Sequence, residues 1–398
     1  MSDPVGPLDG ITVVDLGQIY NAPYATFLFG LAGARIIKVE PLWGDNLRSR
    51  GKVAGAGAPF AMLNSNKEGV TLNLRDPEGA ALLRRMAARA DVLIENFRPG
   101  VMASLGLDAE GLRAENPRLV YASGSGFGTS GPYRDWPAMD LTIQAMSGVM
   151  AVTGFPDSGP VKAGPAIGDF LGGIHLYGAV MTALFQRERT GEGCCVEVAM
   201  LDAIYPSLMS SLGLYFGGTG DTPTRTANRH SGLAESPYNV YPTHDGYLAL
   251  ICVTDAHWRA LVTLMGRPDL AAREDLATRV QRVARMDEVD AIVAAWTVAY
   301  GKEELAALLR GAKVPCAPVR EIGEVVHDPH LHERGMLEEM DHPEYGPLVV
   351  PHSPLRVGDF HAPLTPSPRL GQHNESVYRD WLGLDDDEVR ALAERGVI

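Results

Sequence analysis

One glycine-flanked aspartate of the sequence occupies a position that suits a nucleophile. Asp169 follows Gly168 at the start of a predicted helix over 169–189, where apolar residues recur every three to four positions. A carboxylate there lies near unpaired backbone N–H groups and the positive end of the helix dipole, which keep it ionised. Glycines at 168, 172 and 173 leave little bulk around it, so a ligand can approach. From these features alone, Asp169 is either an attacking carboxylate or an ordinary N-cap.

A second motif, GFGTSG at 126–131, has the spacing of a dinucleotide-binding loop. It follows a predicted strand at 119–123, as such a loop does. However, Pro132 and Tyr133 come next in place of an apolar helix, and no acidic residue ends a following strand about 20 residues further on. A dinucleotide-dependent oxidoreductase is therefore kept only as an unfavoured alternative.

Other chemical motifs are weak. The histidine-rich segment 327–333 has residue types that bind metals, but a proline interrupts it and the HExxH helix pattern is missing. We interpret it as a solvated loop and predict no metal site. The four cysteines form no CxxC pair, which favours reduced, mostly buried thiols. The sequence has no GxSxG motif, so a hydrolase with a nucleophile elbow is not indicated.

Strands and helices alternate around these motifs. β-branched runs predict strands at 11–14, 34–39, 69–74, 92–95, 119–123 and 195–198. Helical periodicity predicts helices at 23–32, 77–90, 108–115, 169–189 and 202–215. Such alternation is typical of an α/β fold with a parallel, helix-covered sheet.

The pattern changes after residue 216. The segment 217–232 is rich in Gly, Thr, Pro and Arg, which indicates a linker or a functional loop. Beyond it we predict a hairpin at 242–252 and helices at 257–265, 287–300 and 302–310. These elements predict a compact second domain, and a short helix is predicted at 385–395.

Composition narrows the function classes. The chain has 398 residues, 45% of them apolar, and a formal charge of −14. This charge argues against a general nucleic-acid or anionic-membrane surface, because such partners require clustered Lys and Arg. The amino terminus lacks a basic segment followed by an apolar core, and no apolar run reaches about 18 residues. We expect a soluble, cytoplasmic protein with no membrane partner.

Six segments together resemble a known family. They are PLDGITVVDLG at 7–17, NAPYAT at 21–26, LAGARIIKVEP at 31–41, ENFRPG at 95–100, SGFGTSGPY at 125–133 and GPAIGDFLGGIH at 164–175. With these segments the sequence resembles class III CoA-transferases of the formyl-CoA and carnitine-CoA transferase type, which are related to α-methylacyl-CoA racemases. The resemblance spans nearly the whole chain.

The resemblance implies an architecture. It indicates an interlocked homodimer in which each chain has a large Rossmann-like domain, built from both chain ends, and a smaller inserted α+β domain. On this basis we predict residues 1–215 as the first part of the large, CoA-binding domain. Residues 216–328 are predicted to form the linker and small domain, and residues 329–398 to return to the large domain.

The resemblance also implies a chemistry. Asp169 would attack an acyl-CoA thioester to give a mixed anhydride, which CoA thiolate converts to an aspartyl-CoA thioester for the acceptor acid. Asp140 matches a supporting glutamate, although it could also be a helix N-cap. Coenzyme A thioester is then a substrate, and no permanently bound cofactor, nicotinamide, ATP or metal is required.

Twelve positions are implied as contacts to CoA. Asn96 and Phe97 match the family identically, whereas Pro41 replaces an arginine and Ser104-Leu105 replace an arginine-methionine pair. We therefore expect Arg75 and Arg98 to supply phosphate contacts. The full set is Ile19, Tyr20, Asn21, Pro41, Leu72, Arg75, Asn96, Phe97, Arg98, Ser104, Leu105 and Met200.

Two departures from the family bear on substrate choice. Met139 stands where the racemases have a catalytic histidine, and it cannot move a proton, so a racemase or isomerase is the second choice. The segment 228–238 does not reproduce the glycine-rich loop of formyl-CoA transferase. We expect small carboxylic acids, with dicarboxylates such as succinate or mesaconate favoured, and Arg229, His230, Tyr20 or Tyr238 as partners for a second carboxylate. Intramolecular CoA transfer and a non-catalytic CoA-binding protein remain alternatives.

Overall fold

The computed structural model describes residues 6–50, 57–218 and 223–398, which form two compact units. The first unit contains the described residues up to Met146 together with Pro165–Ile204 and Asp328–Ile398. The second contains Ser147–Gly164 and the described residues of Tyr205–His327. Residues 205–215 and 147–164 thus group with the second unit, whereas the sequence-based division placed both in the first domain.

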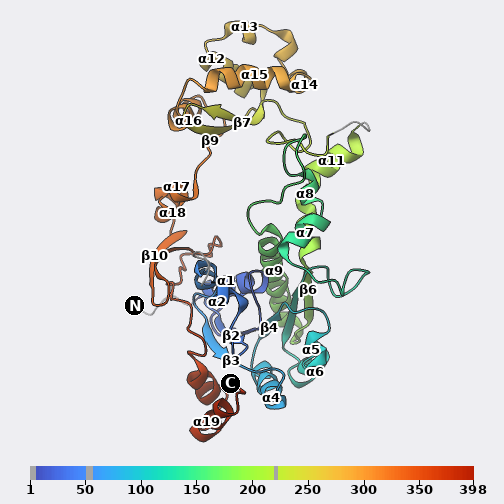
Figure 1. The fold of residues 1–398 in the computed structure, drawn as a ribbon, viewed down its shortest axis with the longest axis vertical. Coiled ribbons are helices and arrows are strands. Elements are labelled where there is room, and N and C mark those ends of the chain that lie inside the picture. The colour runs from blue at the N-terminus through green and yellow to red at the C-terminus, as the bar shows by residue number, and fades with distance from the viewer. Residues whose placement is uncertain (1–5, 51–56, 219–222) are drawn as a thin grey trace. The chain divides into compact units, whose positions relative to one another are not determined.

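A six-stranded parallel sheet forms the centre of the first unit (Figure 1). Its strands are β1 (Thr12–Asp15), β2 (Arg35–Glu40), β3 (Glu68–Thr71), β4 (Val92–Glu95), β5 (Val120–Ser125) and β6 (Cys195–Ala199). Their order is β3-β2-β1-β4-β5-β6, and Val14 of β1 pairs with Ile37 on one side and Leu93 on the other. This order is that of the doubly wound Rossmann sheet, and the order reverses between β1 and β4. The predicted α/β class and parallel sheet are confirmed.

Helices cover both faces of this sheet, as the apolar strands require. On one face, α1 (Asn21–Leu31) and α9 (Ile167–Thr190) pack against each other and against Val13, Ile36 and Ile94. On the other face, α4 (Pro77–Ala87), a π-helical turn (η3, Ser376–Trp381) and α19 (Asp386–Glu394) surround Val14, Ile37 and Leu93. The carboxyl-terminal segment therefore belongs to the core of the first unit.

The remaining elements of the first unit are short. They are α2 (Asn46–Arg50), α3 (Ala58–Leu63), α5 (Val101–Ser104), α6 (Ala109–Glu115), α7 (Asp140–Met146), α10 (Met200–Ile204), α18 (Pro329–Glu333), β10 (Leu337–His342) and β11 (Gly346–Pro351).

The second unit combines a three-stranded antiparallel sheet with helices. The sheet contains β7 (Tyr238–Thr243), β8 (Gly246–Ile251) and β9 (Cys316–Pro318). The helices are α8 (Val149–Val152), η1 (Tyr205–Leu208), α11 (Met209–Gly217), α12 (Asp255–Leu264), α13 (Pro268–Ala271), η2 (Glu274–Leu276), α14 (Arg279–Val283), α15 (Met286–Thr297), α16 (Lys302–Gly311) and α17 (Ile322–Val326). Trp258, Leu261 and Val293 lie in its separate apolar core.

Two local predictions were wrong. The helix predicted over 202–215 is divided among α10, η1 and α11, because Pro206 cannot donate the hydrogen bond that a continuous helix needs. The segment 327–333, interpreted as a loop, contains α18. Asp328 caps this helix by accepting from the N–H groups of His330 and Leu331, and Pro329 occupies its first turn.

Helix α9 is long and apolar enough to cross a membrane by composition alone. A buried core helix has the same properties, and here α9 packs on α1 and the sheet with Leu176 and Val180 fully buried. Packing within the first unit thus accounts for the buried side of α9, whereas Phe170 and Phe185 are exposed.

Candidate active site

A cavity of about 480 Å³ opens at the carboxyl ends of β1, β4 and β5, within the first unit. This is the crevice at which the strand order of the sheet reverses, where open α/β sheets bind their ligands. Seven of the predicted site residues line it. They are Ile19, Asn21, Asn96, Phe97, Arg98, Asp169 and Met200.

Asp169 lies in the first turn of α9, three residues after the N-cap residue Ala166. Its side chain is 9% exposed, and within the described part of the chain no donor forms a hydrogen bond to its carboxylate. Burial and the negative charge of Asp140 raise the pKa of Asp169 to about 7, against a weaker opposing effect of Arg50. The expectation that the helix start keeps this group ionised is therefore corrected, because burial and the charge of Asp140 favour the protonated form.

Asp140 joins α7 to the start of α9. Its Oδ1 accepts from the backbone N–H of Gly168 at 2.8 Å, and its Oδ2 accepts from Gln144 Nε2 at 2.7 Å. Both oxygens are therefore bound to protein groups. Sequence reasoning did not identify Gln144, although its spacing of four residues from Asp140 places both on one helix face.

Asn21 connects α1 to Asp169. Its Nδ2 donates to the backbone oxygen of Asp169 at 3.4 Å. A Cβ atom at Gly172 would lie 2.1 Å from Asn21 Nδ2, and one at Gly173 would lie 2.6 Å from the Asn21 backbone oxygen. These two glycines therefore accommodate α1, not a ligand as the sequence suggested, and they bring the start of α1 beside the nucleophile candidate.

The other predicted contact positions do not line this cavity. Tyr20 stacks on Phe170 with ring centroids 6.0 Å apart, Leu72 is in the apolar core, and Leu105 packs against that core. Ser104 Oγ donates to the Val101 carbonyl, Arg75 is exposed, and Pro41 follows β2.

Of the side chains proposed to hold a second carboxylate, Tyr20 lies in the first unit, and Arg229, His230 and Tyr238 have partners within the second unit. Arg229 forms ion pairs with Asp287 at 2.6 Å and Asp290 at 2.7 Å. His230 Nδ1 accepts from the N–H of Gly232 at 3.1 Å, and its ring packs on Tyr238. Arg229 in particular is neutralised by two carboxylates, which weakens it as a ligand for a third.

An aromatic wall of the cavity was not anticipated. Phe127 lies 6.0 Å from Trp136 between ring centroids, and both residues line the cavity together with Met139. They belong to the segment that follows β5 and includes GFGTSG. No helix begins there until Asp140, so this segment lacks the helix start that a dinucleotide-binding loop provides. Aromatic residues directly after a strand end were the available signal.

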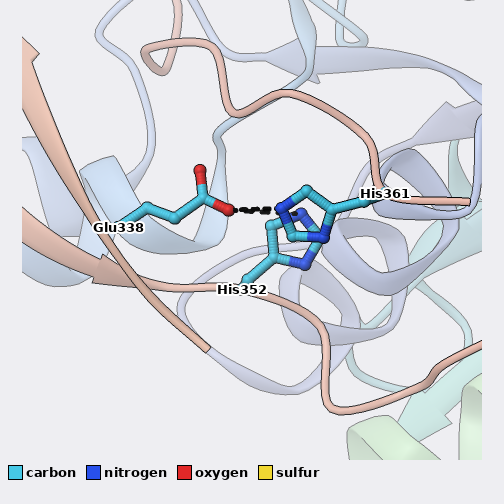
Figure 2. Close-up of side chains that lie close together, drawn as sticks. All are labelled: Glu338, His352 and His361. Carbon is cyan, nitrogen blue, oxygen red and sulfur yellow. Dashed lines mark hydrogen bonds and ion pairs between the residues drawn. The ribbon is translucent and has the colours of Figure 1, made fainter. Parts of the chain in front are cut away.

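Glu338, His352 and His361 form a cluster of metal-binding residue types outside the cavity (Figure 2). Arg356 Nη1 lies 3.4 Å from His361 Nδ1 and can only donate, so Nδ1 accepts and Nε2 donates to Glu338 at 2.6 Å. His352 Nε2 is bonded to the Ala362 carbonyl at 2.9 Å. The two rings stack with centroids 4.0 Å apart, and one nitrogen or oxygen from each of the three side chains lies within 4.8 Å of the other two. Each histidine Nε2 has a hydrogen-bond partner, so the three side chains form a hydrogen-bonded cluster.

Comparison with known proteins identifies the family of this chain. The sequence profile of "CoA-transferase family III" matches residues 8–374. Acetyl-CoA:oxalate CoA-transferase of Acetobacter aceti is 36% identical, covering 95% of this chain and 96% of that protein. Succinate–glutarate CoA-transferase of Agrobacterium fabrum is also 36% identical, with 93% and 94% covered. The crystal structure of a CAIB/BAIF family protein from Brucella suis superposes with a TM-score of 0.83 at 35% identity, covering 95% of this chain and all of that one. The chain is therefore a class III CoA-transferase and belongs to CoA-transferase family III.

Proposed function

We propose that this enzyme transfers CoA between small carboxylic acids through covalent intermediates on Asp169. The observation that carries the proposal is a buried carboxylate, without a hydrogen-bond donor among the described residues, that faces a ligand-sized cavity. Unlike a structural carboxylate, it has no cation bonded to it among the residues that the structure describes, so its burial is not offset.

The proposed reaction conserves the energy of the thioester. An ionised Asp169 oxygen attacks the thioester carbonyl of the donor, the C–S bond breaks, and CoA leaves as a thiolate. The thiolate attacks the aspartyl carbonyl of the mixed anhydride and releases the donor as a carboxylate. The acceptor carboxylate then attacks the carbonyl of the aspartyl-CoA thioester, which releases the thiolate and forms a second mixed anhydride. The thiolate attacks the acceptor's acyl carbon in this anhydride, which gives the new acyl-CoA and releases the Asp169 carboxylate. Each step exchanges one nucleophile for one leaving group, so no net proton is consumed.

The environment of Asp169 suits this chemistry. Burial restricts the access of water, which would hydrolyse the anhydride. A pKa of about 7 leaves a substantial ionised fraction near neutral pH. The burial that raises this pKa also leaves the ionised carboxylate poorly solvated, which favours its attack on the thioester. Arg98, exposed at the cavity, is the proposed partner for CoA phosphate.

We propose dicarboxylic acids as the substrate class. Support comes from the names of two relatives, which act on oxalate or on succinate and glutarate. The interlocked homodimer and the cytoplasmic location stay predictions from the sequence, as does the lack of a permanently bound cofactor.

Trapping the intermediate tests the proposal directly. The protein is incubated with succinyl-CoA, treated with hydroxylamine or borohydride, and digested for mass spectrometry. We expect modification at Asp169 in the wild type and none in Asp169→Asn. An unmodified Asp169, together with exchange of the α-proton of a branched acyl-CoA, would support the racemase instead. Transfer activity that survives Asp169→Ala would also overturn the proposal.

A further inference from the structure

Three consecutive residues between β1 and α1 are held by side chains from other parts of the first unit. The N–H of Gly17 donates to Asp15 Oδ1 at 2.7 Å, and its carbonyl accepts from Lys38 Nζ at 2.5 Å. The N–H of Ile19 donates to Asp45 Oδ2 at 3.4 Å. These contacts fix the two ends of the segment 17–19.

Asn96 holds the middle of the segment. Its Oδ1 accepts from the N–H of Gln18 at 2.8 Å, and its Nδ2 donates to the carbonyl of Gln18 at 2.9 Å. The Asn96 amide thus bonds both the N–H and the carbonyl of Gln18, as the backbone of a neighbouring strand would. Both polar atoms of Asn96 are engaged in this way, which leaves its side chain poorly suited to the direct CoA contact expected from the sequence.

The held segment is strained and borders the cavity. Ile19 has a φ of 65°, in the left-handed region that β-branched residues avoid. Such strain costs on the order of 1–3 kcal/mol and persists only where surrounding contacts impose it. Gln18 and Ile19 line the same cavity as Asp169, and the chain leads from them to Asn21, which contacts the Asp169 backbone.

We propose that Asn96 is a positioning residue for CoA transfer. By bonding the backbone of Gln18, it holds the wall formed by Gln18 and Ile19 at the distance from Asp169 that the bound thioester requires. This inference rests on the proposed nucleophilic role of Asp169. A displacement of about 1 Å at such a wall can lower the rate by roughly a hundredfold, because the reacting atoms lose their alignment.

A matched pair of variants separates positioning from structural support. Asn96→Ala removes both bonds to Gln18. Asn116→Ala is the control, because Asn116 Nδ2 also bonds backbone carbonyls, those of Ala87 and Ala90 at 2.9 Å, away from the cavity. The melting temperature, the KM for succinyl-CoA and the rate of Asp169 modification at saturating succinyl-CoA are measured for both. Asn96→Asp, which keeps the acceptor for the Gln18 N–H, serves as a partial rescue.

The outcomes divide clearly. We expect both alanine variants to melt at lower temperature than the wild type, and only Asn96→Ala to slow Asp169 modification at saturation, by about tenfold or more. Asn96→Asp should lie between Asn96→Ala and the wild type. A higher KM with an unchanged saturated rate would show that Asn96 contacts CoA directly, and equal saturated rates in both alanine variants would show a structural role only. A wild type that is not modified at Asp169 would remove the proposed nucleophile itself.

Discussion

Two buried aspartates of the first unit have opposite electrostatic environments. Burial of Asp15 alone would raise its pKa, but Lys67 and Lys38 hold the pKa below its ordinary value, and the Thr26 hydroxyl donates to it. Asp169 is buried next to another carboxylate and has its pKa raised to about 7. Asp15 therefore stays ionised through pairing, whereas Asp169 carries an unfavourable charge whenever it is ionised.

The difference supports the proposal that Asp169 is the reactive carboxylate, whereas Asp15 is structural. Lys67 Nζ lies 2.9 Å from Asp15 Oδ2, and both side chains have no exposed surface. A carboxylate with such a partner is stabilised and is a poor nucleophile. The carboxylate of Asp169 lacks such a bonded cation among the described residues and faces a cavity, which is the environment expected of a group that reacts.

The largest effect on stability is expected where the pairing of Asp15 is removed. Lys67→Met leaves Asp15 buried with one cation fewer, and breaking such a pair destabilises a protein by about 3–5 kcal/mol. Urea unfolding of the variant should show this loss. Lys67→Met combined with Asp15→Asn should recover part of it, because no uncompensated charge then remains at this pair. A single variant as stable as the wild type would contradict the contrast between the two aspartates.

At Asp169 we expect a smaller effect on the free energy of unfolding, and here removing the charge stabilises the folded protein. Its folded-state pKa of about 7 lies above the ordinary 3.8, so the folded protein binds more protons than the unfolded chain between these values, and stability falls as pH rises across them. The difference between these two pKa values corresponds to at most about 4 kcal/mol of unfolding free energy. Asp169→Asn removes this loss, so its stability relative to the wild type should increase from pH 5 to pH 8 in urea unfolding. A constant difference would mean that Asp169 titrates normally.

The sequence predicted the sheet well because its strands are apolar on both faces. Val92–Glu95 was predicted to the residue, since the apolar run Val92–Ile94 is typical of a fully buried parallel strand and is followed by the polar Glu95. The prediction of one helix over 202–215 was wrong because the apolar periodicity of this segment was given more weight than Pro206, which interrupts the helix. The second half of the Ser147–Gly164 segment is rich in Gly and Pro, which indicates a loop, but such a composition does not say which unit the loop joins. Its grouping with the second unit depends on contacts that sequence does not encode locally.

The structure brings seven of the predicted site residues to one cavity, but the electrostatics there could not be read from the sequence. Asp169 was identified from its place at a glycine-rich helix start, yet its raised pKa depends on Asp140, 29 positions earlier, and on burial. Similarly, Gly172 and Gly173 were recognised, but only the packing of α1 shows that they accommodate Asn21. Local patterns give the residue types, whereas charges that meet across elements require the fold.

The smallest expected effect is a shift in the pH profile of Asp169 modification when Asp140 is substituted. Asp140→Asn keeps an oxygen for the Gly168 N–H but removes the negative charge that helps to raise the pKa of Asp169. The pKa of Asp169 should fall, so the acid limb of the pH profile for Asp169 modification should move to lower pH. Because burial is the larger cause, the limb should remain above the ordinary pKa of an aspartate. Single-turnover modification by succinyl-CoA across pH 5–9 measures this, with Asp202→Asn as a control outside the cavity. An unmoved acid limb would mean that burial alone sets the pKa of Asp169, and that Asp140 serves only to fix the start of α9.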